Sequence, residues 1–286
     1  MSTGERIRAC LVAGGVSALL GVMSAWAQAP QSPPVFPWGG QDAALQPPEK
    51  ITPPAVKFNP RDLSGVWLRQ GEQALSDGPP PKMTAAGDAI FRQSIVSVVN
   101  ELQNEPPPPI KGNDPIMRCD PYGFPRVLWD FGAPMELAHL PNRIVQFFEW
   151  THAWRDIWTD GRQLPKDPDP RWMGYSVGRW EGDTLVVETI GFDQRAWLDE
   201  LGHRHSGKGR FVERYRRTDA RTMQYDATLT DPEYYTQPWV GTTRTFRLLP
   251  MEGWPQAELR EEFCAPSIEQ NFNETIRDPA GGKVTP

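Results

Sequence analysis

The chain has 286 residues and a formal net charge of −6. With these acidic totals no basic face is indicated, so we expect no nucleic-acid partner. The length is sufficient for one domain with a sizeable core, because β-barrels of this size commonly remain single domains.

The first 27 residues have the pattern of a secretory signal. Arg6 and Arg8 precede an uncharged run over residues 9–25, and Ala25 and Ala27 occupy the −3 and −1 positions of a cleavage site. The alternative is a membrane-spanning helix, which needs about 20 apolar residues, whereas this run is short and rich in glycine and alanine. We therefore expect cleavage after Ala27 and a periplasmic or secreted protein without a membrane span.

The mature chain is predicted to begin with a proline-rich arm. Residues 28–60 contain nine prolines and little apolar periodicity, which favours an extended segment over a packed element. The domain proper is expected over residues 61–286, and its first strand begins at Gly65-Val66-Trp67.

One principal helix is predicted over residues 84–103. Its apolar residues from Phe91 to Leu102 recur at i, i+4, i+7 and i+11 and form a single stripe, and Thr84 is suited to cap the first turn.

From residue 143 onward the pattern changes to short β-prone runs separated by turn residues, such as Glu181-Gly182-Asp183 and Asp160-Gly161. The spacing is too short for βαβ units. It predicts an all-β, mainly antiparallel fold: an up-and-down meander or closed barrel. The strands are expected near residues 143–150, 153–159, 173–181, 184–191, 209–217, 222–230, 242–249 and 257–263.

Two cysteines, Cys119 and Cys264, remain after removal of the leader. In an oxidising compartment such a pair often forms a disulfide, and we expect one here. The alternative is two buried, unpaired thiols.

The most specific segment of the chain is WMGYSVGRWEGDTLVVETIGF at residues 172–192, followed by WLDELGHRHS at 197–206, ERYRR at 213–217 and DPEYYTQPW at 231–239. These segments resemble a large family of secreted, mostly uncharacterised bacterial proteins. Gly65-Val66-Trp67 also resembles the Gly-x-Trp signature of lipocalin-like barrels. The resemblance covers residues 60–265 and implies export and a lipocalin-like barrel. It implies no particular activity.

The loop after the strand at 184–191 has the densest set of reactive side chains: Asp199, His203, His205 and Ser206. Histidine can transfer protons near neutral pH, and Asp199 is placed to orient either ring. We predict His205 as the proton-transfer group and His203 as its substitute. The alternative is a connecting loop whose histidines bind backbone groups.

Glu149 and Arg155 form a second candidate. Glu149 shares a strand face with Val145 and Phe147, so it could point into a barrel lumen and pair with Arg155 across the hairpin to bind or polarise a substrate. The alternative is a structural salt bridge. Glu213 and Tyr215 alternate with Phe211 in the same way and are predicted to contact ligand.

Aromatic residues complete the predicted site, with Trp197, Tyr235 and Trp239 as flat walls for a planar or apolar ligand. His203-x-His205 without a third fixed ligand is too weak a pattern to predict a metal. We find no phosphate loop, dinucleotide fingerprint or nucleophile elbow and therefore predict no cofactor.

Three functions fit these patterns. The first is a cofactor-independent lyase, isomerase or hydrolase that acts on a small, aromatic substrate in a barrel cavity. The second is a non-catalytic periplasmic carrier of an apolar or aromatic molecule. The third is a structural envelope module that docks through its proline-rich arm. The sequence does not determine the oligomeric state.

Overall fold

The computed structural model describes residues 52–71, 80–95, 113–129 and 133–265, all within the compact unit of residues 46–286. The predicted signal peptide and most of the predicted arm lie outside these ranges. Within them, no helix is long and apolar enough to cross a membrane, and no three His, Cys, Asp or Glu side chains gather into a possible metal site.

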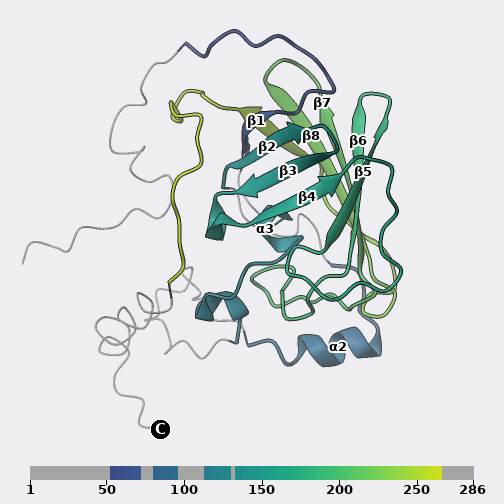
Figure 1. Cartoon of the computed structure of the whole chain (residues 1–286). Helices are drawn as coiled ribbons and strands as arrows, with labels where there is room; N and C mark the ends of the chain where they lie inside the picture. The colour runs from purple at the N-terminus through teal and green to yellow at the C-terminus, as the bar shows by residue number, and fades with distance from the viewer. Residues whose placement is uncertain (1–51, 72–79, 96–112, 130–132, 266–286) are drawn as a thin grey trace, which may run out of the picture. The chain divides into compact units, whose positions relative to one another are not determined.

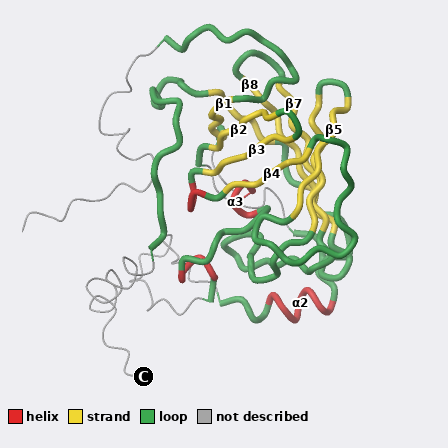
Figure 2. The backbone as a smooth tube through the Cα atoms, viewed as in Figure 1, coloured by secondary structure: helices red, strands yellow, loops and turns green. Residues whose placement is uncertain are grey.

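Ten strands and a few short helices make up the fold (Figures 1 and 2). The strands are β1 (Gly65–Arg69), β2 (Met135–Leu140), β3 (Arg143–Phe148), β4 (Trp154–Trp158), β5 (Tyr175–Glu181), β6 (Thr184–Ile190), β7 (Arg210–Arg217), β8 (Thr222–Thr230), β9 (Trp239–Val240) and β10 (Arg244–Leu248). The helices are α2 (Ala85–Phe91), α3 (Arg126–Trp129) and the 3₁₀ turns η2 (Pro115–Arg118) and η3 (Trp150–His152).

The sheet closes into a barrel, which confirms the predicted fold class. Strands β1 to β8 pair in sequence order, and β10 pairs with both β1 and β8 to close the ring, while β9 pairs with β8 alone. All neighbours are antiparallel except β4 and β5, which run parallel because residues 159–174 cross over between them. The barrel is therefore mixed at this one junction.

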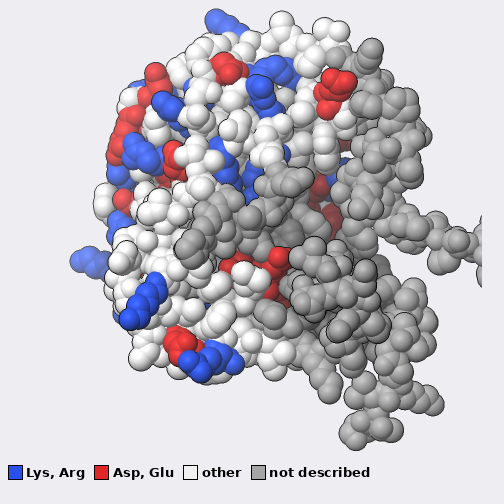
Figure 3. Space-filling view, turned by 180° about the vertical axis from the view of Figure 1, so that it is seen from behind, with Lys and Arg blue, Asp and Glu red and all other residues white. Residues whose placement is uncertain are grey.

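Side chains from successive strands fill the barrel and account for the alternating pattern of the sequence. In β7 and β8 every second residue is buried, including Phe211, Tyr215, Tyr225 and Leu229. Trp67 is fully buried, and its indole N–H donates to the Leu63 carbonyl at 2.8 Å. Where the described residues are visible on the face drawn in Figure 3, acidic and basic side chains are interspersed.

The predicted helix is shorter than expected in its described part. Thr84 caps α2 by accepting from the Gly87 N–H at 3.1 Å, as predicted. The helix ends at Phe91, because tertiary hydrogen bonds to Asn113 replace the next helical turn. Ile95, which the apolar stripe placed on the buried face, is 55% exposed. Residues 96–103 lie outside the described ranges.

The predicted strand at 257–263 is wrong. Both edges of β10 are already paired, with β1 and with β8, so a strand that follows β10 in the chain finds no free edge beside it. Instead, residues 259–264, here called the C-terminal strap, run along the outside of the barrel past the turn that follows β3 (Figure 1).

Candidate functional site

Polar side chains from the six strands β3 to β8 meet in one layer of the barrel lumen. Three of these residues were predicted as site residues: Arg155, Glu213 and Tyr215. The Arg155 guanidinium donates to Glu213 Oε1 and to Gln146 Oε1, each at 2.8 Å. The hydroxyls of Tyr215 and Tyr225 also donate to Glu213 Oε1, at 2.6 and 3.2 Å. Burial raises the pKa of both tyrosines, so they stay protonated as donors.

The predicted pair between Glu149 and Arg155 does not form. Strand β3 ends at Phe148, and Glu149 has a helical backbone (φ −60°, ψ −43°), so its side chain leaves the alternation of the strand. Its carboxylate instead accepts from the backbone N–H of Arg260 at 2.9 Å and pairs with the Arg260 guanidinium at 3.3 Å.

Aromatic packing fills the lumen beside the polar layer. The Arg155 guanidinium carbon lies 3.8 Å from the centroid of the Phe124 ring, which packs edge-on against Phe211 at 5.3 Å. Phe124 lies two residues before α3 and is fully buried. Arg155, Glu213 and Tyr215 therefore form part of a packed interior, and their role toward a ligand stays a prediction.

The loop after β6 brings Asp199 and His203 together. The His203 Nδ1 lies 2.6 Å from Asp199 Oδ2, and the other carboxylate oxygen accepts from the backbone N–H groups of Leu201 and His203. The ring of His203 stacks on Phe91 of α2 at 4.8 Å and stands edge-on to Trp239 at 5.2 Å.

Two more of the predicted aromatic residues lie in this part of the molecule. Tyr235 packs against Trp239 at 5.5 Å and donates its hydroxyl to the Arg204 carbonyl at 2.8 Å. Trp197 is almost fully buried and lies under the Arg204 guanidinium at 5.1 Å.

His205 is fully buried, with its ring edge-on to Phe192 at 5.3 Å. Its Nδ1 lies 3.3 Å from the Ser206 carbonyl, which can only accept, so Nδ1 carries the proton. Its Nε2 has no hydrogen-bond partner in the described part of the chain. Burial lowers the pKa of this imidazole.

That lowered pKa predicts a loss of stability in weak acid. The unfolded chain binds a proton at His205 near its ordinary pKa of about 6.5, whereas burial moves proton binding by the folded chain to lower pH. The free energy of unfolding should therefore fall as the pH drops through 6.5, by at most about 1.4 kcal/mol per pH unit from this group. Urea unfolding between pH 7.5 and 5.5 measures how the free energy of unfolding depends on pH, and this dependence should be weaker in His205→Asn than in the wild type. The same dependence in both proteins would contradict the prediction.

A cleft of about 310 Å³ opens between the C-terminal strap, the turn from β3 to β4 and two further loop segments. Its aromatic and apolar walls are Trp154, Trp172, Met173 and Phe263, and the remaining lining residues are Cys119, Pro121, Thr151, His152, Ala153 and Cys264. We call it the strap cleft.

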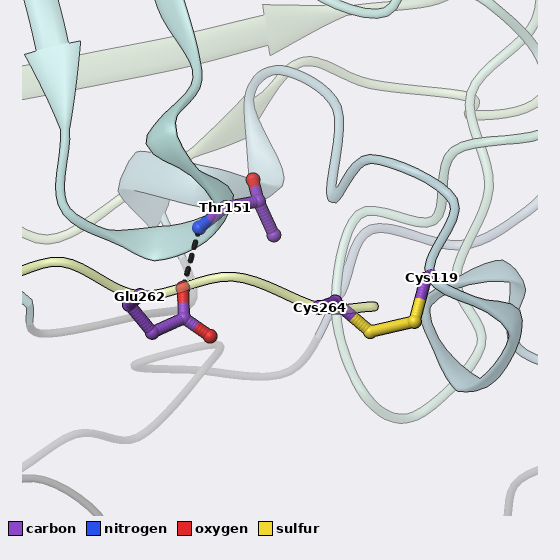
Figure 4. The surroundings of a disulfide bond; sticks show 4 residues. All are labelled: Cys119, Thr151, Glu262 and Cys264. Carbon is purple, nitrogen blue, oxygen red and sulfur yellow. Dashed lines mark hydrogen bonds between the residues drawn. A yellow bond between two sulfur atoms is a disulfide. The ribbon is translucent and has the colours of Figure 1, made fainter. Parts of the chain in front are cut away.

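The strap is fastened to the β3–β4 turn on one side of the cleft and to η2 on the other (Figure 4). The Thr151 N–H donates to the Glu262 carboxylate at 2.6 Å, and His152 Nδ1 lies 2.7 Å from the Glu262 carbonyl oxygen and 3.3 Å from the Glu262 backbone nitrogen. The shorter contact is to an oxygen that can only accept, which assigns the proton to Nδ1. The His152 ring also stacks on Phe263 at 4.4 Å. The predicted disulfide between Cys119 and Cys264 is confirmed and forms part of the cleft wall.

Backbone strain gathers at the strap cleft. Among the described residues, the non-glycine positions with left-handed backbone are Cys119 (φ 61°), Thr151 (φ 57°) and His152 (φ 48°). All three line the cleft. Such conformations cost about 1–3 kcal/mol each and are concentrated at functional sites.

The predicted catalytic and ligand-binding residues do not line the strap cleft, and of the residues that do, sequence reasoning singled out only the two cysteines, as a disulfide. The one available signal in the sequence was a tryptophan near the start of a predicted strand, Trp154, which the structure shows to be 60% exposed. Thr151 and His152 gave none, because neither residue type indicates left-handed backbone.

Compared with protein-family models, curated proteins and solved structures, the chain matches none of them.

Proposed function

We propose that this protein is an exported binding protein for a small, planar and largely apolar molecule, which it holds in the strap cleft. The observation that carries the proposal is the coincidence of the cleft with the three left-handed non-glycine residues. A backbone held in costly conformations around a cavity is expected where the shape of that cavity is used.

The lining chemistry supports an aromatic ligand. Ligand pockets in proteins have volumes of about 300–1,000 Å³ and combine apolar walls with a few fixed polar groups. The strap cleft lies at the lower end of that range, which favours a one- or two-ring molecule. His152 provides the fixed polar group, because donation of its Nδ1 proton to Glu262 leaves Nε2 as an acceptor for a ligand hydroxyl or N–H.

Export is part of the proposal. The basic, apolar and small-residue pattern of residues 1–27 supports a cleaved leader. A disulfide between Cys119 and Cys264 persists in oxidising compartments such as the periplasm.

Removal of the Trp154 ring should weaken ligand binding without unfolding the protein. With 2-naphthol as probe, Trp154→Ala should raise Kd by about tenfold or more, since an aromatic contact contributes about 0.5–1.5 kcal/mol beyond its buried area. Its high exposure should keep the change in unfolding free energy within about 0.5 kcal/mol. Isothermal titration calorimetry measures the Kd.

Trp158→Ala is the matched control on the same strand. Trp158 does not line the cleft and stacks with Arg162 at 3.5 Å. Its Kd for 2-naphthol should equal that of the wild type. If both variants lose affinity equally, or if Trp154→Ala binds normally, the cleft is not the binding site.

A second function is favoured by the pair of Asp199 and His203. Their 2.6 Å contact orients the imidazole as an acid–base group requires, which fits a cofactor-independent lyase, isomerase or hydrolase. In a screen of aromatic, lignin-like and ester substrates, His203→Asn should lower turnover by about 10²–10⁴-fold. His139→Asn, at an exposed position of β2, serves as the matched control, and equal activity in His203→Asn and wild type would rule out this role.

A further inference from the structure

Strand β4 leaves part of its edge unpaired at the strap cleft. Its parallel pairing with β5 comprises Ile157 with Ser176 and Trp158 with Val177. Continued in the same register, the pairing would place Met173 opposite Trp154. The chain turns away before that point, because Gly174 has φ +62° and its N–H donates back to the Arg171 carbonyl at 3.1 Å. Trp154 and Met173 therefore lie on two sides of the opening, and both line the cleft.

The backbone of Trp154 faces this opening. Ala153 accepts from the Phe148 N–H at 2.9 Å, and Thr159 donates to the Asn142 carbonyl at 3.0 Å, so the odd-numbered residues of β4 bond to β3. Backbone groups alternate in direction along a strand, so the N–H and C=O of Trp154 point to the other side. In the described part of the chain, neither group has a hydrogen-bond partner.

We propose that the ligand of the strap cleft is an acylated aromatic amino-acid residue in extended conformation, as found in a peptide. This inference rests on the proposed binding function and names its ligand class. Two antiparallel residues that face each other can exchange both N–H···O bonds. A bound residue would donate its N–H to the Trp154 carbonyl and accept from the Trp154 N–H.

The same geometry accounts for the aromatic walls. Residues directly opposite each other across two strands carry their side chains on the same face of the sheet, about 4.5–5.5 Å apart at Cβ. An aromatic side chain on the bound residue would thus lie beside the Trp154 indole, which is 60% exposed on that face. A ring alone would use the walls but leave both backbone groups of Trp154 unpaired.

The test compares three probes by calorimetry: N-acetyl-phenylalaninamide, its ester analogue O-acetyl-phenyllactamide, and 2-naphthol. The ester analogue keeps the ring and both carbonyls and lacks only the N–H that would bond to the Trp154 carbonyl. We expect it to bind about three- to tenfold more weakly than the amide, as one net hydrogen bond implies. If the ester binds as tightly as the amide while 2-naphthol binds, the ligand class is wrong and the proposed function stands. If none of the three binds, the proposed function itself fails.

A pair of variants tests the other hydrogen bond. Trp154→Ala and Trp154→Pro both lose the ring, but only proline also removes the N–H. Proline is tolerated at the first residue of a strand, and Ala153 already has the extended backbone (φ −75°, ψ 153°) that precedes proline. N-acetyl-phenylalaninamide should bind Trp154→Pro about three- to tenfold more weakly than Trp154→Ala, while 2-naphthol should not distinguish them. Equal affinity of the amide for both variants would overturn the inference.

Discussion

Glu213→Gln should lower the free energy of unfolding by about 3–5 kcal/mol, the cost of breaking a buried ion pair by removing one partner. Arg155 and Glu213 are both almost completely buried, and their contact is 2.8 Å. Glutamine keeps the size of the side chain and an acceptor for the two tyrosine hydroxyls but removes the negative charge. The Arg155 cation would then lie in the packed lumen without compensation. Urea unfolding of the two proteins measures the difference.

Glu188→Gln is the matched control at the surface. Glu188 pairs with Arg179 at 3.2 Å and also with Arg210; both guanidinium groups are more than half exposed, and the Glu188 side chain itself is 19% exposed. Exposed ion pairs contribute about 0–1 kcal/mol, so this variant should unfold close to wild type. A second variant separates charge from packing: Arg155→Met with Glu213→Leu removes both charges and should recover part of the loss. The remainder is the cost of the Tyr215 and Tyr225 hydroxyls, which lose Glu213 as their acceptor. If Glu213→Gln alone costs less than about 1 kcal/mol, Arg155 is not held as an uncompensated cation.

Loss of the disulfide should have the second large effect. Cys119 and Cys264 are separated by 145 residues, and closing a loop of that length stabilises the folded state by at most about 5 kcal/mol through the entropy of the unfolded chain. The double variant Cys119→Ser with Cys264→Ser should therefore lose up to that amount in urea unfolding. Because both sulfur atoms belong to the cleft wall, its affinity for 2-naphthol should fall as well.

Reduction of the wild type provides the comparison for this variant. Dithiothreitol should lower the stability of the wild type to that of the serine variant and leave the variant unchanged. The polar contacts of Glu262 with Thr151 and His152 do not depend on the sulfur atoms. If the variant keeps wild-type stability, these contacts alone hold the strap and the disulfide adds nothing.

The barrel could be predicted from sequence because strands with one buried face show period-two alternation. Strands β7 and β8 follow this pattern, and all four strands from β5 to β8 lie within a few residues of their predicted bounds. β2 was missed because its last two residues, His139 and Leu140, are exposed and interrupt the alternation. β9 has two residues, too few for any period. The parallel junction of β4 and β5 depends on a crossover path, which local pattern does not encode.

The candidate site was less predictable, for two physical reasons. Reactive residue types such as His205 and Glu213 stand out in a sequence, but their partners and burial depend on which strands close the barrel. The strap cleft is assembled from four separate segments of the chain, which contribute Cys119 and Pro121, Thr151 to Trp154, Trp172 and Met173, and the strap. The cysteine pair was the one long-range constraint that the sequence expressed, and it links two of those segments.

The strap cleft is tested most directly by following the indole N–H signals of the tryptophans in ¹H–¹⁵N spectra during titration with 2-naphthol. We predict that the signals of Trp154 and Trp172, which line the cleft, shift with a common saturation curve. The signal of Trp67, buried in the barrel core, should stay in place. Shifts confined to Trp67 or Trp239, with Trp154 and Trp172 unmoved, would place the ligand elsewhere and contradict binding in the strap cleft.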